Sequence, residues 1–166
     1  MEYRLIYEDT DGQCKIIVPD THFRQPSESD EASIGRIYAL AIPGVVEFIV
    51  CTPEKIPGDL VFREAWTKGD SHEPIKVDFD KAMAIHRRRL EEAAENKIEK
   101  LDKELDIALE NDNLPAQVAI RRTKKILRTI HETNLTHCKK VEDIKWSIPK
   151  ELYDVWVYYD PSNGIL

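Results

Sequence analysis

The sequence lacks long apolar runs, because no segment approaches the roughly 18 residues that a membrane-spanning helix needs. The first residues, MEYRLIYEDTDG, also lack the basic and apolar regions of a secretory signal peptide. Charged residues make up 33% of the chain, and hydrophobic residues, at 42%, are numerous enough to form a core. These features predict a soluble globular protein that is made in the cytoplasm.

Cysteine is scarce, and the three that are present, Cys14, Cys51 and Cys138, lie far apart. A small secreted domain normally has a denser and even set, so we expect three reduced thiols in or near the core. His131, His137 and Cys138 are close in sequence, but His137 and Cys138 are adjacent and lack the spacing of zinc ligands. We interpret this stretch as a polar turn and predict no metal site.

Glycine is scarce too, and the six glycines are isolated, so none forms a phosphate-binding loop. No local motif indicates an activated nucleophile. The sequence leaves open a Cys–His nucleophile pair that is assembled from distant parts of the chain. The net charge of −7 argues against a nucleic-acid surface, which needs clustered Lys and Arg. We therefore expect no enzyme, no catalytic residue, no cofactor, and no nucleic-acid, membrane or small-molecule partner.

Residues 1–74 predict a β-rich N-terminal domain with one short helix. Apolar residues alternate with polar ones on both sides of Asp11 and Gly12, which is typical of a β-hairpin. The helix should begin at Ser29 or Asp30, since either side chain can cap its first turn.

Two further features belong to this predicted domain. Residues 45–51, VVEFIVC, have the strongest strand character in the chain. Phe62 and Trp66 are large apolar residues four positions apart, which fits one helical turn or an extended pair.

Residues 75–135 predict a long antiparallel helical hairpin. Residues 79–110 contain no proline or glycine, and their apolar residues recur every three or four positions, as in a coiled-coil seam. The short turn 111–113 leads to Pro115, which suits the first turn of a second helix that runs to about Thr133. The expected apolar face of the second helix consists of Ala119, Ile120, Ile126, Leu127 and Ile130.

Opposite charges on the two predicted helices support their antiparallel pairing and predict its register. Folding back about Asn113 aligns three pairs: Glu104 with Arg122, Asp102 with Lys124, and Glu99 with Arg128. Exposed pairs contribute only about 0.2–1 kcal/mol each, so the apolar seam should supply most of the stability.

Residues 136–166 predict a C-terminal segment with an aromatic strand, ELYDVWVYYDP. This strand could complete the protein's own sheet or add to the sheet edge of a partner, and both readings stay open. Tyrosine and tryptophan are favoured at interfaces. The candidate interface residues are Trp146, Tyr153, Trp156 and Tyr158. The expected fold class is thus α+β, with a β-rich domain, a helical hairpin and a terminal strand.

Two stretches of the sequence carry a resemblance to known proteins. The first consists of Ile42-Pro43-Gly44, Val46 to Val50, Ile56-Pro57-Gly58-Asp59, Phe62-Arg63, Ala65-Trp66, Val77-Asp78, Lys81-Ala82 and Ile85. It resembles short phage and prophage proteins encoded near tail genes. The second is the helical hairpin that ends in Asp143-Ile144-Lys145-Trp146 with Pro149 shortly after. It is similar to the C-terminal part of tail fibre assembly proteins, where proline follows the tryptophan directly.

The resemblance implies a non-enzymatic protein of the tail or tail-fibre module. It would be made in the host bacterial cytoplasm and act by contact with a tail fibre or baseplate protein, as a structural part of the virion tail. The alternatives are a tail fibre assembly chaperone that is not retained, or a phage-encoded intracellular regulatory binding protein. A homo-oligomer is compatible with each.

Overall fold

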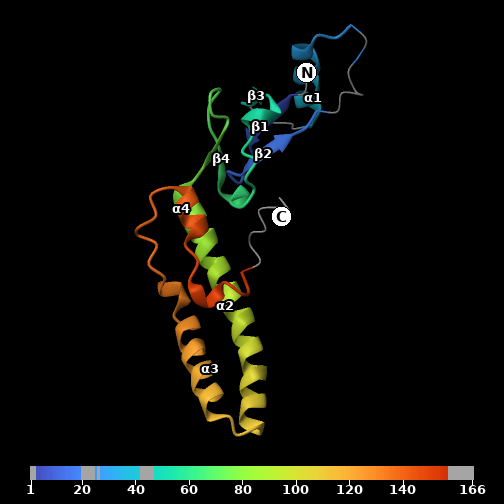
Figure 1. Ribbon diagram of the computed structural model, residues 1–166. Coiled ribbons are helices and arrows are strands. Elements are labelled where there is room, and N and C mark those ends of the chain that lie inside the picture. The colour runs from blue at the N-terminus through green and yellow to red at the C-terminus, as the bar shows by residue number, and fades with distance from the viewer. Residues whose placement is uncertain (1–2, 20–24, 26, 42–46, 157–166) are drawn as a thin grey trace. The chain divides into compact units, whose positions relative to one another are not determined.

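The computed structural model describes residues 3–19, 25, 27–41 and 47–156 (Figure 1). It combines small antiparallel sheets with a long helix and several shorter ones, so the predicted mixed α+β class is confirmed. The chain divides into two compact units, Met1–Asp78 and Phe79–Leu166. Within the described ranges, no helix has the length and apolar character needed to cross a bilayer.

The first unit contains a three-stranded antiparallel sheet in the order β2-β1-β3. Its strands are β1 (Arg4–Glu8), β2 (Cys14–Ile17) and β3 (Ile49–Cys51). The predicted hairpin between β1 and β2 is confirmed. Its turn is closed by the Gly12 N–H, which donates to the Asp9 carbonyl at 3.0 Å, and Gly12 adopts a positive φ of 72° that glycine tolerates best.

The predicted helix and the third strand are also present. Helix α1 (Asp30–Ala41) is capped by Ser29, whose Oγ accepts the Ala32 N–H at 3.2 Å. Strand β3 covers the last three residues of the predicted strand 45–51. Residues 45 and 46 of that prediction lie outside the described residues.

A second sheet pairs β4 (Trp66–Lys68) with β5 (Ile75–Val77), after the 3-10 turns η2 (Pro53–Lys55) and η3 (Arg63–Ala65). The predicted domain boundary after residue 74 is therefore wrong, because β5 pairs with β4 and the unit ends at Asp78. The core of this unit gathers Ile6, Cys51, Trp66 and Ile75. Phe62 precedes η3 and is buried like Trp66, which lies in β4.

The β4–β5 turn leaves no room for a side chain at Gly69. The Gly69 N–H donates to the Pro74 carbonyl at 2.9 Å, and a Cβ at Gly69 would stand 2.0 Å from the Glu73 carbonyl oxygen. Gly69→Ala must therefore displace backbone, and we expect a loss of about 1–3 kcal/mol in the free energy of unfolding, measured by urea denaturation. Gly58→Ala is the control, because a Cβ there meets no atom within 4 Å. Equal stability of the two variants would contradict this turn geometry.

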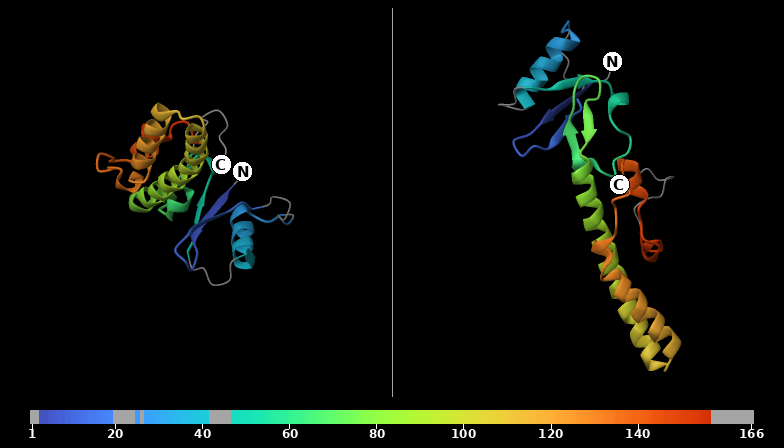
Figure 2. Two further views of the ribbon diagram at one scale, coloured as in Figure 1. Left: turned by 90° about the horizontal axis from the view of Figure 1, so that it is seen from below. Right: turned by 90° about the vertical axis from the view of Figure 1, so that its left-hand side faces the viewer.

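The second unit begins with α2 (Phe79–Glu110), which confirms the long helix predicted for residues 79–110. Asn113 caps α3 (Leu114–Leu127), since its Oδ1 accepts the Ala116 N–H at 3.2 Å. Figures 1 and 2 show α3 running back beside the C-terminal part of α2. Helix α3 ends before the predicted Thr133, and a 3-10 turn, η4 (Ile130–Glu132), follows.

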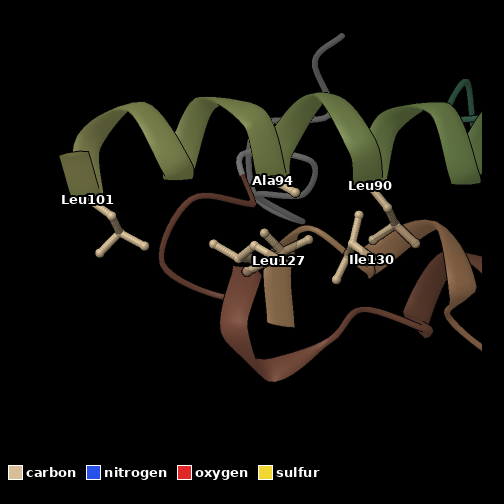
Figure 3. Packing of buried hydrophobic residues seen from close by; sticks show 6 residues of the cluster. Leu90, Ala94, Leu101, Leu127 and Ile130 are labelled. Atoms are coloured by element: carbon tan, nitrogen blue, oxygen red, sulfur yellow. The ribbon is translucent and has the colours of Figure 1, made fainter. Parts of the chain in front are cut away.

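The core of the second unit forms between α2, α3 and the segment that follows them. Its buried members are Leu90, Ala94, Leu101, Leu127, Ile130 and Leu152. Figure 3 shows Leu127 and Ile130 beneath the α2 face that carries Leu90 and Ala94. The expected apolar face of α3 is wrong at Ala119 and Ile126, which are exposed, whereas Lys124 on another side of the helix is buried.

Lys124 is 8% exposed and forms an ion pair with Asp102, as the register predicted. The other two expected pairs, Glu104 with Arg122 and Glu99 with Arg128, are not among the ion pairs of the described residues.

The predicted aromatic strand is wrong for residues 150–156. They form the 3-10 turn η5 (Lys150–Leu152) and a further turn, in which the Trp156 N–H donates to the Leu152 carbonyl at 2.8 Å. Leu152, Val155 and Trp156 are spaced three and four residues apart, so one turn can direct all three side chains to the core formed with α2. Residues 136–156 thus belong to the second unit and form no separate domain.

Candidate protein-binding site

Helix α4 (Val141–Trp146) holds the predicted interface residue Trp146 at its C-terminal end. Asp143 fixes the start of this helix, because its Oδ2 accepts the N–H groups of Lys139 at 2.9 Å and Lys140 at 3.0 Å. These two hydrogen bonds lower the pKa of the Asp143 carboxyl group. Ile144 is fully buried and fastens the helix to the core.

Ser147 joins α4 to the preceding loop. Its Oγ donates to the Asp143 carbonyl at 2.7 Å and lies 3.0 Å from His137 Nε2 and 3.2 Å from Cys138 Sγ. Ser147 Oγ thus connects α4 to the loop that carries His137 and Cys138.

The residues weighed as metal ligands do not gather into a site. Among the described residues, no group of three His, Cys, Asp or Glu side chains is placed to hold a metal ion. His137 Nε2 and Cys138 Sγ both contact Ser147 Oγ, whereas His131 Nε2 lies 3.8 Å from Glu132 Oε1. His131 lies in η4, His137 lies in a turn, and Cys138 follows that turn. Cys138 and Cys51 are buried and Cys14 is half-buried, and burial raises the pKa of the Cys14 and Cys51 thiols.

His86 on α2 anchors the segment that carries the groove described below. It is 2% exposed, its Nε2–H donates to the Ser147 carbonyl at 3.1 Å, and its ring meets Trp156 edge-on with centroids 5.6 Å apart. Burial lowers the pKa of His86, the nearby Arg89 lowers it further, and the hydrogen bond to Ser147 opposes them.

Acidification is expected to destabilise the second unit through His86. Because the folded state holds His86 neutral with a pKa below 6.5, the unfolded chain takes up the proton first. This stabilising effect is complete above about pH 6.5 and is lost as the pH falls below that value. We expect urea denaturation to show a smaller stability at about pH 5.5 than at about pH 7.5.

The control for this prediction is His86→Gln, whose amide can still donate to the Ser147 carbonyl. The loss between these two pH values should shrink in the variant. Carboxyl groups such as Asp143 and Asp154 also lose their stabilising effect on acidification, but below their ordinary pKa of 3.8. An undiminished loss in the variant would assign the effect to other histidines.

Beside α4 lies an open groove of about 620 Å³. Trp146 lines it and is 60% exposed, although tryptophan is usually well buried. Lys145 Nζ lies over the Trp146 ring, 5.6 Å from its centroid, and this cation–π contact helps to orient the indole. The other lining residues are Ile126, Thr129, Ile130, Glu132, Thr133, His137, Ser147, Ile148, Pro149 and Glu151.

The three predicted interface residues that the structure describes, Trp146, Tyr153 and Trp156, do not gather in one place. Trp146 lines the groove, and Tyr153 is 67% exposed but is not part of the lining. Trp156 packs against the core cluster and His86, so its ring has a structural role. Tyr158 lies outside the described residues.

Sequence reasoning missed Ile126 as part of this site. Its side chain is 39% exposed and lines the groove, although its position on the helix suggested the core. The available signal was Lys124, whose charge opposite Asp102 marks the side of α3 that faces α2.

Comparisons with known proteins find no matching family model, no matching curated protein and no matching solved structure.

Proposed function

We propose that this chain is a non-enzymatic protein of the tail or tail-fibre module of a tailed phage. It acts as a virion structural or fibre-attachment component through contact with a tail fibre or baseplate protein. The observation that carries the binding role is the exposed Trp146 in an open groove. The phage context rests on the resemblance of residues 42–149 to phage tail-module proteins.

Trp146 has the properties of a binding hot spot. Such residues are enriched in tryptophan, and they contribute most when a partner removes both faces of the ring from water. The walls of the groove are mixed, with Ile126 and Pro149 as apolar surface and Thr129 as a hydrogen-bonding side chain. Buried Ile144 and the Ser147 hydrogen bonds hold α4 in place, so little conformational entropy would be lost on binding.

The direct test is mass spectrometry of virions purified from the phage or induced prophage that encodes the chain. The proposal expects the chain at a fixed ratio to tail proteins. Its absence from virions, with presence in infected cells, would contradict a structural role. In that case the protein that co-purifies with it would distinguish an assembly chaperone from a regulatory binder.

A substitution then tests the groove itself. Trp146→Ala should weaken the contact by about tenfold or more, measured as copies retained per virion or as the dissociation constant for the co-purifying tail protein. Leu60→Ala is the matched control, because Leu60 is a 41% exposed apolar residue on the first unit. Equal retention of the two variants would place the contact elsewhere.

A further inference from the structure

The solvent-facing side of α3 is basic and aliphatic in a chain whose net charge is −7. Residues 114–131 contain no aspartate or glutamate. Arg121, Arg122 and Lys125 are exposed, and so are Leu114 at 68% and Val118 at 60%. At 3.6 residues per turn, these five side chains fall within about 100° of the helix circumference, opposite the buried Leu127. We call them the basic face of α3.

These cations have no acidic partner in the described part of the second unit. The predicted register placed Glu104 opposite Arg122 and Glu99 opposite Arg128, but neither pair is among the ion pairs of the described residues. Arg121 and Lys125 likewise form none within residues 79–156. Among the described residues of this unit, no acidic side chain therefore neutralises the basic face.

The solvent-facing side of α2 between residues 95 and 110 is mainly acidic, and the exposed Lys103 lies at its edge. Glu95, Glu99, Asp106 and Glu110 are all exposed and fall within about 60° of the helix circumference, opposite the buried Ala94 and Leu101. We call them the acidic face of α2. Since α2 and α3 turn their buried sides towards each other, the two charged faces lie on opposite sides of the helix pair.

We propose that copies of this chain associate side by side, with the basic face of α3 in one copy against the acidic face of α2 in the next. The complementary charges of the two faces select a second copy as the occupant. Leu114 and Val118 supply apolar surface that such a contact would remove from water. Because the two faces differ, the contact is heterologous, so it continues into a ring or a row of copies.

The contact is expected to be weak and sensitive to salt. Exposed ion pairs stabilise little individually, and about 0.5 M salt screens them over a few ångströms. Sedimentation equilibrium of the whole chain at low salt should therefore give an average mass that rises with protein concentration. The mass should return to that of the monomer at about 0.5 M NaCl. A monomeric mass at every concentration would overturn the proposal.

Charge reversal provides the sharpest test. Variant one carries Arg121→Glu, Arg122→Glu and Lys125→Glu, and variant two carries Glu95→Lys, Glu99→Lys and Asp106→Lys. Each variant alone sets like charges against each other, so its dissociation constant should rise by about tenfold or more. An equimolar mixture restores opposite charges at every contact and should associate again. Failure of the mixture to associate would overturn the proposal.

Further measurements exclude trivial outcomes. Circular dichroism establishes that both variants keep their helices, and Leu114→Ser with Val118→Ser weakens the contact without altering charge. A sample treated with nuclease must still associate. Association that depends on added polynucleotide would show that the basic face binds nucleic acid and would overturn contact between copies. Leu60 on the first unit belongs to neither face, so Leu60→Ala should leave association unchanged.

Discussion

Leu127→Ala is expected to destabilise the second unit by about 2–5 kcal/mol, the range for large-to-small substitutions in a packed core. Leu127 is 1% exposed and contacts the cluster that holds α2, α3 and η5 together. Figure 3 shows its side chain facing Ala94, which is too small to close the space that the substitution leaves. Little relaxation is available, so the cost should lie in the upper half of the range.

Urea denaturation monitored by circular dichroism measures this loss, and hydrogen exchange locates it. Amides of α2 and α3 should exchange faster in the variant than in the wild-type chain. Leu109→Ala is the control, because Leu109 is a 44% exposed leucine on α2, and its substitution should change stability by about 0.5 kcal/mol or less. Equal losses in both variants would contradict the core as described.

The helices could be predicted because their patterns are long and local. Helix α2 has 32 residues without proline or glycine, and its apolar spacing needs no knowledge of a partner. The start of α3 follows from Asn113 and Pro115 in the same way. One ion pair, Asp102 with Lys124, came from the register that the short turn imposes.

For residues 150–156 the C-terminal strand was mispredicted, because strand propensity depends on what the segment packs against. Tyr153, Val155 and Trp156 favour a strand by residue type. The spacing of Leu152, Val155 and Trp156, however, suits a single turn on the surface of α2. Lys97 adds a tertiary constraint, since its Nζ donates to the Glu151 carbonyl at 2.6 Å and lies 2.5 Å from Asp154 Oδ1. No local pattern contains these contacts.

Of the residues that line the groove, the sequence identified only Trp146 as a candidate interface residue. The walls of the groove come from the end of α3, from η4 and from residues 146–151, which approach one another only in the folded unit. Trp146 was found by residue type, whereas Ile126 was assigned to the core. Ile126 lies about 160° round the helix from Lys124, which pairs with Asp102 on α2, so the Ile126 side chain points away from α2.

Trp66→Ala is expected to destabilise the first unit by about 3–5 kcal/mol. Trp66 is 3% exposed and packs with Ile6, Cys51 and Ile75, so it contacts both sheets of that unit. Its removal leaves a cavity among Ile6, Cys51 and Ile75. The loss is measured by urea denaturation and by hydrogen exchange of the amides in β1 and β4.

Trp66→Phe separates packing from hydrogen bonding at this position. Within the described residues, the buried Trp66 Nε1–H has no hydrogen-bond partner, and a donor buried in this way costs about 1–3 kcal/mol. Phenylalanine removes that donor and keeps most of the apolar surface, so the two effects oppose each other. The net change should be much smaller than for alanine. The contrary result would be that Trp66→Phe lowers the free energy of unfolding as much as Trp66→Ala does. That result would mean that the indole N–H has a hydrogen-bond partner in solution, and that this core tolerates a change of shape less well than a change of polarity.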